Sequence, residues 1–215
     1  AHDKAQQADI LFRLSKYVRD NVQVNCLHVS ESEHAYTIFE SLNDRGIDLS
    51  VLDLLKNHVF KGAGPQHETQ VQHNWTTMLA RLGDRNADDF LKAFWTSRHG
   101  RTQRGRLFHE LKKKYLTKDH VLELSSNLAD LADTYANIEL ADSDVWSKYS
   151  ESTRESVSAL SILGGQQTHP IVLSALARLD PAAIERLLRY LVTLTVRYQL
   201  VGRGRTGRLE IMAAT

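Results

Sequence analysis

The chain has 215 residues with a hydrophobic fraction of 42%, enough to bury a sizeable core in one large domain or two small ones. Only 3 prolines and 11 glycines argue against a loop-rich β-sheet design and favour helices. The formal net charge of +1 excludes a surface that is basic throughout, so any basic binding site has to be local.

The first predicted elements are a helix and a strand. Apolar residues recur at helical spacing from Ile10 to Val18, which predicts an amphipathic helix over about residues 3–20. The segment at residues 22–29 is β-branched and alternates apolar with polar residues, which predicts one short strand. Because a lone strand cannot satisfy its own backbone groups, we expect it to pair with a sheet outside this sequence.

The rest of the chain predicts helices whose ends carry capping signals. Ser50 with Asp53 opens a helix that reaches Phe60, and Asn86 with Asp89 opens another. Thr168 and Asp180 with Pro181 predict the starts of the last two helices. Periodicity predicts further helices at residues 30–42, 107–115, 119–140, 152–163 and 182–200. Two more are predicted by one end only: a helix that ends at residue 82 and a helix that begins at residue 168. The last of these is apolar on most sides, which predicts a central position, and residues 61–68 predict a loop. We therefore expect an all-α protein of about eight to ten helices with one orphan strand.

Catalytic and metal-binding patterns fail on their spacing. His109 and Glu110 begin a pattern like that of a zinc protease, but Lys113 stands where the second histidine is needed. The 10 histidines are scattered without the spacing of a metal site, which favours structural roles for them. We therefore expect no catalytic residue, no metal site and no cofactor in this segment.

Two basic segments predict a binding surface. The first runs from residue 98 to residue 114 with Glu110 as its only acid, and the second is interleaved with glycines after the last helix. The nucleic-acid-binding candidates are Arg98, Arg101, Arg104, Arg106, Lys112, Lys113, Lys114, Arg203, Arg205 and Arg208. Arginine offers a fork of donors that matches phosphate, although runs of charge are more often solvated helix faces and loops.

A polar loop of Asn43, Asp44, Arg45 and Gly46 separates two of the predicted helices. Asn43 and Asp44 are good helix stoppers, and Gly46 adopts a positive φ angle without strain, so the loop has a structural explanation. That explanation leaves out Arg45, which near a helix end can instead hold an anion or pair with a carboxylate. Local chemistry leaves both interpretations open.

The run AYTIFESLNDRGIDLSVLDLLKNHVF, residues 35–60, resembles a signature of the N-terminal domain of GmrSD-type restriction endonucleases. That domain is the domain-of-unknown-function family numbered 262, which is related to the ParB/sulfiredoxin fold. The positions that match its pattern are Phe39, Leu42, Asn43, Gly46, Leu49, Ser50, Asp53, Leu54, Leu55, Lys56 and Asn57. Similar segments follow, so the resemblance covers nearly the whole chain.

The resemblance implies a bacterial, cytoplasmic, NTP-dependent protein that recognises and cuts modified or foreign DNA, as in phage defence. The family's Asp-Gly-Gln-Gln-Arg motif for nucleotide hydrolysis and its HNH nuclease motif are absent from this sequence. The similar GGQQT at residues 164–168 lacks the acid and the arginine, which favours a helix stop and cap. A single cysteine, Cys26, and the lack of a membrane-spanning run fit a cytoplasmic protein.

We therefore expect residues 1–60 to end a ParB-like region and residues 61–215 to form a helical subdomain of a longer protein. Its partners would be DNA, the missing N-terminal sheet and a C-terminal nuclease domain, with NTP and magnesium bound only by the full-length protein. The same resemblance places Asn43, Asp44, Arg45 and Gly46 near the nucleotide pocket. The alternative function is a non-catalytic helical module whose basic loops bind a protein partner.

Overall fold

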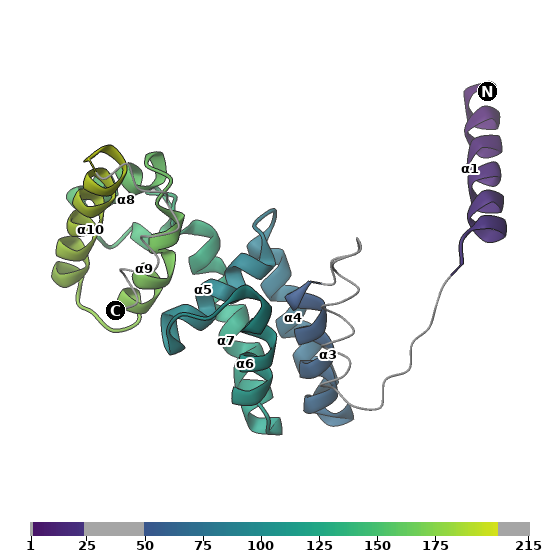
Figure 1. The fold of residues 1–215 in the computed structure, drawn as a ribbon, viewed down its shortest axis with the longest axis horizontal. Helices are drawn as coiled ribbons and strands as arrows, with labels where there is room; N and C mark the ends of the chain where they lie inside the picture. Colours follow the sequence, from purple (N-terminus) through teal and green to yellow (C-terminus); the bar gives the residue numbers. More distant parts are fainter. Residues whose placement is uncertain (1, 24–49, 202–215) are drawn as a thin grey trace. The chain divides into compact units, whose positions relative to one another are not determined.

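The computed structural model describes residues 2–23 and 50–201 of a chain that divides into two units, residues 1–48 and 49–215. All regular structure in this described part is helical, with nine α-helices joined by short 3-10 turns, which confirms the all-α class (Figure 1). None of the described helices combines the length and the apolar character needed to cross a membrane. The division expected between residues 60 and 61 stays a prediction, and the helix expected at residues 30–42 lies outside the described residues.

In the first unit, the structure describes a single helix, α1 (His2–Asn21), close to the one predicted at residues 3–20. The apolar side chains of α1 from Ile10 to Val18 are exposed, and Phe12 reaches 71% exposure. The helix surface also carries a salt bridge between Arg13 and Asp9, one turn apart. In an exposed position such a pair adds little to stability.

The strand expected at residues 22–29 is not borne out. The backbone N–H of Val22 donates to the carbonyl of Val18 at 3.0 Å, so Val22 completes the last turn of α1. Gln23 has no regular structure, and residues 24–29 lie outside the described part of the chain. An alternating run this short is a weak signal, because a strand needs a neighbouring strand to be stable.

In the second unit, the first of two cores is enclosed by α3 (Val51–Ala63), α4 (Glu68–Leu82), α5 (Ala87–His99), α6 (Leu107–Lys114) and α7 (Lys118–Asn137). The most extensive contact between two helices joins α4 and α7. Their buried residues recur every three or four positions, as Trp75 and Met78 do on α4 and Leu124 and Leu128 do on α7. Each such side chain contributes about 1.5–3 kcal/mol of hydrophobic stabilisation.

The second core is enclosed by α8 (Glu151–Ile162), α9 (His169–Leu176), α10 (Pro181–Val196) and the turn η3 (Asp144–Trp146). Helices α8 and α10 lie side by side (Figure 1). Two residues outside these helices also contribute to this core: Ala93 of α5, and Ile138, which directly follows α7. A π-helical turn, Arg197–Val201, follows α10.

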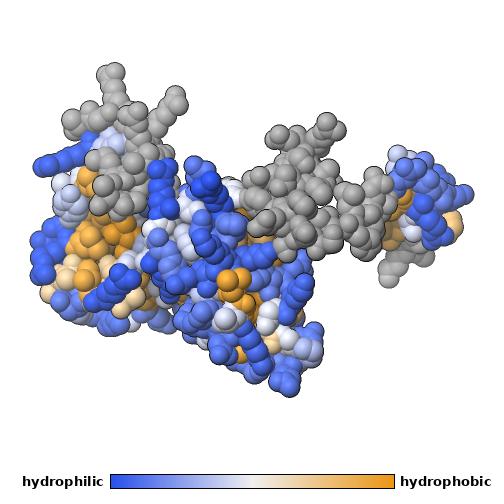
Figure 2. Space-filling model, turned by 60° about the horizontal axis from the view of Figure 1, so that its bottom comes forward, coloured by the Kyte–Doolittle hydropathy of each residue, from blue (hydrophilic) through white to orange (hydrophobic). Residues whose placement is uncertain are grey.

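The predicted central position of α10 is wrong. The helix buries one face, with Ile184, Leu188 and Leu191 almost fully inaccessible, whereas Tyr190 is 63% exposed. Its packing partners among the α-helices are chiefly α8 and, to a smaller extent, α9. Leucine and valine of α10 outside the buried face are only partly covered. On the face of the molecule drawn in Figure 2, apolar patches interrupt a mostly hydrophilic surface.

The predicted capping residues begin the helices as expected. The side chains of Ser50, Asn86 and Asp180 accept the backbone N–H of the residue three positions later, at 3.1, 2.9 and 2.9 Å. Pro181 then takes the first position of α10, where its fixed φ angle suits a helix and no N–H is needed. These caps define the starts of α3, α5 and α10.

The loop expected at residues 61–68 is only partly right. Helix α3 continues to Ala63, a 3-10 turn η1 (Pro65–His67) follows, and Glu68 already belongs to α4. Gly64 separates the two helices with a φ angle of 71°, which a residue with a side chain rarely adopts. The glycine and proline signals therefore predicted the break between the two helices correctly, but the predicted loop was too long.

Gly165 begins the 3-10 turn η4 (Gly165–Thr168), where the backbone turns back close to Leu160 of α8. A Cβ atom here would lie 2.9 Å from the backbone oxygen of Leu160. We expect Gly165→Ala to lower the free energy of unfolding by about 1–3 kcal/mol, as measured by urea denaturation. The control is Gln166→Ala at an exposed position of the same turn, and equal losses for the two variants would contradict the prediction.

Candidate nucleic-acid interface

The basic segment from residue 98 to residue 114 covers the end of α5, the turn η2 (Arg104–Arg106) and α6. Tyr115, the residue after α6, joins these elements to each other. It is buried, its hydroxyl lies 3.4 Å from Nε2 of His99 on α5, and its carbonyl lies 2.8 Å from Nε2 of His58 on α3. The packing of Tyr115 therefore brings the last turn of α6 to the end of α5.

The cationic side chains of this segment face solvent. Arg98, Arg101, Arg106, Lys113 and Lys114 are exposed, and Lys112 is half-buried. Within the described part of the chain, none of these six forms an ion pair with a carboxylate. Arg98 is the most constrained, because its guanidinium lies 4.3 Å from the centre of the Phe94 ring and donates to the Ser97 hydroxyl at 3.2 Å.

Arg178, which the sequence did not suggest, joins this surface from the turn after α9. Burial lowers the pKa of Arg98 most, Tyr115 raises it, and the positive charge of Arg178 lowers it again. Helix α5 packs along α9, and Arg178 lies in the turn that follows α9. We define the basic face as Arg98, Arg101, Arg106, Lys112, Lys113, Lys114 and Arg178.

The other predicted binding residues stay untested. Arg104 begins η2, beside the basic face. Arg203, Arg205 and Arg208 lie outside the described residues, as does the loop of Asn43, Asp44, Arg45 and Gly46.

Helix dipoles offer a structural explanation for part of the basic face. The ends of α5, α6 and α9 lie at this surface, and cations are favourable near the last turn of a helix. Each helix end carries about −0.5 elementary charge, so three ends contribute about −1.5 against seven cations. The charge of the cations therefore exceeds that of the helix ends about fivefold, and a clear positive excess remains.

A buried polar cluster lies between α7 and α9. Glu139, just after α7, accepts from Nη1 of Arg85 at 2.6 Å and contacts Nε2 of His169 at 3.1 Å. Burial and the carboxylates of Asp89 and Glu139 raise the pKa of Tyr135, whose ring packs edge-on against His169, to about 12. The adjoining cavity of about 20 Å³ has room for one water molecule, so this cluster is structural.

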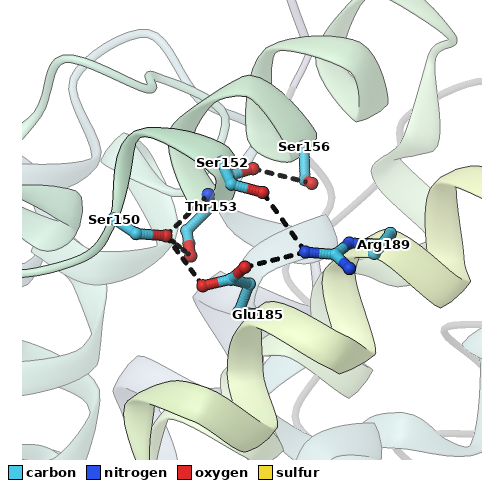
Figure 3. Close-up of polar contacts among 6 residues, drawn as sticks. All are labelled: Ser150, Ser152, Thr153, Ser156, Glu185 and Arg189. Atoms are coloured by element: carbon cyan, nitrogen blue, oxygen red, sulfur yellow. Dashed lines mark hydrogen bonds and ion pairs between the residues drawn. The ribbon is translucent and has the colours of Figure 1, made fainter.

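A second polar network joins the start of α8 to α10 (Figure 3). Ser150 accepts the backbone N–H of Thr153 at 3.2 Å and donates to Glu185 at 2.8 Å. Arg189 donates to Glu185 at 2.8 Å and to the hydroxyl of Ser152 at 3.4 Å. Since its members bond to one another, this network fixes α8 against α10 and leaves no activated nucleophile.

Within residues 2–23 and 50–201, no three His, Cys, Asp or Glu side chains lie close enough together to hold a metal ion. Comparisons with models of protein families, with curated proteins and with solved structures gave no match. The resemblance of residues 35–60 to the GmrSD-type domain therefore stays a prediction from the sequence. Among the described residues, the basic face is therefore our candidate binding site.

Proposed function

We propose that this chain is the helical part of an NTP-dependent restriction protein of the cytoplasm, and that its basic face contacts the phosphate backbone of DNA. The observation that carries the DNA contact is the set of seven cations from α5, α6 and the end of α9, without a carboxylate partner among the described residues. Lysine and arginine on phosphate supply most of the affinity for nucleic acid that is independent of sequence.

The restriction context comes from the signature at residues 35–60. In such a protein the nucleotide state is coupled to a nuclease, and modified or foreign DNA is the target. NTP with magnesium would bind to the ParB-like sheet, near Asn43, Asp44, Arg45 and Gly46. The basic face would hold the DNA, and no chemical step is assigned to a residue of this chain.

The experiment uses a variant in which four exposed cations of the basic face are replaced: Arg101→Gln, Arg106→Gln, Lys113→Gln and Lys114→Gln. We expect binding to duplex DNA to weaken about 10- to 100-fold near physiological salt, because four phosphate contacts are lost. The plot of log affinity against log salt should also become shallower by up to about four units. Fluorescence anisotropy over a series of salt concentrations measures both quantities.

The control replaces four exposed cations outside the basic face, Lys16, Lys61, Lys148 and Arg186, by glutamine. It changes the net charge by the same amount, so it separates a local contact from a general attraction. If both variants lose affinity equally, or if neither loses any, the basic face is not the DNA contact.

A protein-interaction module is the second candidate function, and the exposed apolar side chains of α1 favour it. Ile10, Leu11, Phe12, Leu14, Tyr17 and Val18 are between 49% and 71% exposed. Contiguous apolar residues on a surface mark sites of association. Salt separates the two functions, because binding through an apolar surface persists at salt concentrations that abolish phosphate contacts.

A further inference from the structure

His99 lies at the centre of the contacts that hold the basic face together. Its ring centroid is 4.4 Å from that of Trp95 and 6.4 Å from that of Tyr115, and its Nε2 lies 3.4 Å from the Tyr115 hydroxyl. Tyr115 is itself fixed through its carbonyl, 2.8 Å from Nε2 of His58. An exposed histidine thus has a defined position on an otherwise solvated surface.

Two cations act on this histidine. Arg98 precedes it on α5, and Lys114 precedes Tyr115 at the end of α6. Burial lowers the pKa of His99 most, and the charges of Lys114 and Arg98 lower it further.

Two more charged groups face this cluster from other helices. Burial raises the pKa of Tyr115, Arg98 lowers it, and Glu123 of α7 raises it. Arg178, from the turn after α9, acts on Arg98. The Glu123 carboxylate thus reaches this cluster through Tyr115, the residue that His99 contacts.

We propose that Arg98, His99 and Lys114 form a site for one phosphate group, and that His99 takes up a proton from solvent when the phosphate binds. Without a ligand, the two neighbouring cations favour the neutral imidazole, and a bound oxyanion reverses the local field and favours imidazolium. Because Nε2 faces the Tyr115 hydroxyl, Nδ1 is the ring nitrogen left to donate to a phosphate oxygen. When the bound phosphate is a phosphate of DNA, this inference rests on the proposed function.

The sign of the pH dependence follows from this cycle. Affinity rises as the pH falls from the pKa of His99 in the complex towards its lower pKa in the free protein. Below the lower pKa the imidazole is charged with or without the ligand, so affinity levels off. Arginine and lysine stay protonated throughout this range and contribute no such change.

The first test is NMR of the imidazole rings of the whole chain, titrated from about pH 5 to about pH 8 with and without inorganic sulfate. Sulfate is a tetrahedral oxyanion that keeps its charge over this range. The pKa of His99, assigned through His99→Gln, should rise by about one pH unit or more, and sulfate should not move the ring resonances of His73 on α4. An unchanged pKa of His99 overturns the proposal, whether or not sulfate binds elsewhere.

Lys114→Gln supplies a second variant, which leaves the rings of Trp95, His99 and Tyr115 in place. It should reduce the rise in the pKa of His99 that sulfate causes. A rise as large as in the unsubstituted protein would mean that sulfate binds without Lys114 and would overturn the site.

The second test measures the affinity for duplex DNA at about pH 5.5 and about pH 7.5 at constant salt. We expect about threefold to tenfold tighter binding at the lower pH, and His99→Gln should lose this preference while His73→Gln keeps it. If the unsubstituted protein and His99→Gln respond to pH equally, the inference fails and the proposed function stands. If DNA binds at neither pH, the proposed function fails and the sulfate titration alone decides the inference.

Discussion

Trp146→Ala is expected to lower the free energy of unfolding by about 3–5 kcal/mol. Trp146 is fully buried in the second core although it belongs to a three-residue turn, η3. Its ring packs against Tyr149, and its Nε1–H donates to the carbonyl of Ile138 at 3.1 Å. Alanine would leave a cavity and an unpaired carbonyl, and urea denaturation followed by circular dichroism measures the loss.

Two variants separate these contributions. Trp146→Phe keeps an aromatic ring but removes the N–H and part of the indole, so we expect a loss of about 1–3 kcal/mol from the unpaired carbonyl and the smaller side chain. Tyr190→Ala, at an exposed position of α10, should change stability by no more than about 0.5 kcal/mol. A loss for Trp146→Ala as small as that of Tyr190→Ala would contradict the burial of Trp146.

Glu139→Ala is expected to lower the free energy of unfolding by about 2–4 kcal/mol, because Arg85 and His169 both lose their acceptor. The side chain of Glu139 is only 15% exposed, whereas that of Arg85 is 36% exposed and can regain water. Most of the effect should therefore come from the buried His169. Glu139→Gln keeps an acceptor and the shape of the side chain, so it should lose less.

The same cluster predicts how stability depends on pH. Burial lowers the pKa of His169 overall, although the attraction of Glu139 raises it and Arg85 lowers it again. The pKa of His169 in the folded state thus lies below the unfolded value of about 6.5. The contribution of neutral His169 to the free energy of unfolding is therefore complete above about pH 6.5, and it is lost as the pH falls through the folded pKa.

In Glu139→Ala the attraction disappears and the pKa of His169 falls further. The difference in stability between about pH 7.5 and about pH 5.5 should therefore be larger in Glu139→Ala than in the unsubstituted protein. Urea denaturation at the two pH values measures it, and an equal or smaller difference would show that Glu139 does not favour the charged imidazole.

The predictions that succeeded depend on neighbouring residues. Ser50, Asn86 and Asp180 cap helices through atoms only three residues away, so the signal is complete within a short window. The exposed cations of α5 and α6 were also found, because charge clusters are visible in a short stretch. Their binding role stays a proposal.

The predictions that failed, and the residues that were missed, depend on tertiary contacts. The apolar pattern of α10 does not reveal that its partners among the described α-helices are chiefly α8 and α9, and the alternation at residues 22–29 does not supply a partner strand. Arg178 reaches the basic face only because α9 packs along α5. The pairing of Glu139 with His169 likewise joins residues 30 positions apart, and no spacing rule predicts it.

The basic face draws its residues from both cores. Helices α5 and α6 bury Phe94 and Leu111 in the first core, whereas Arg178 follows α9, which belongs to the second. A polyanion that contacts Lys114 and Arg178 together therefore binds only the arrangement in which the second core rests against the first. Such a ligand raises the free energy needed to detach α8, α9 and α10, in proportion to the logarithm of its concentration once the site is saturated. Ligand binding at the basic face and the packing of the two cores against each other are thus linked.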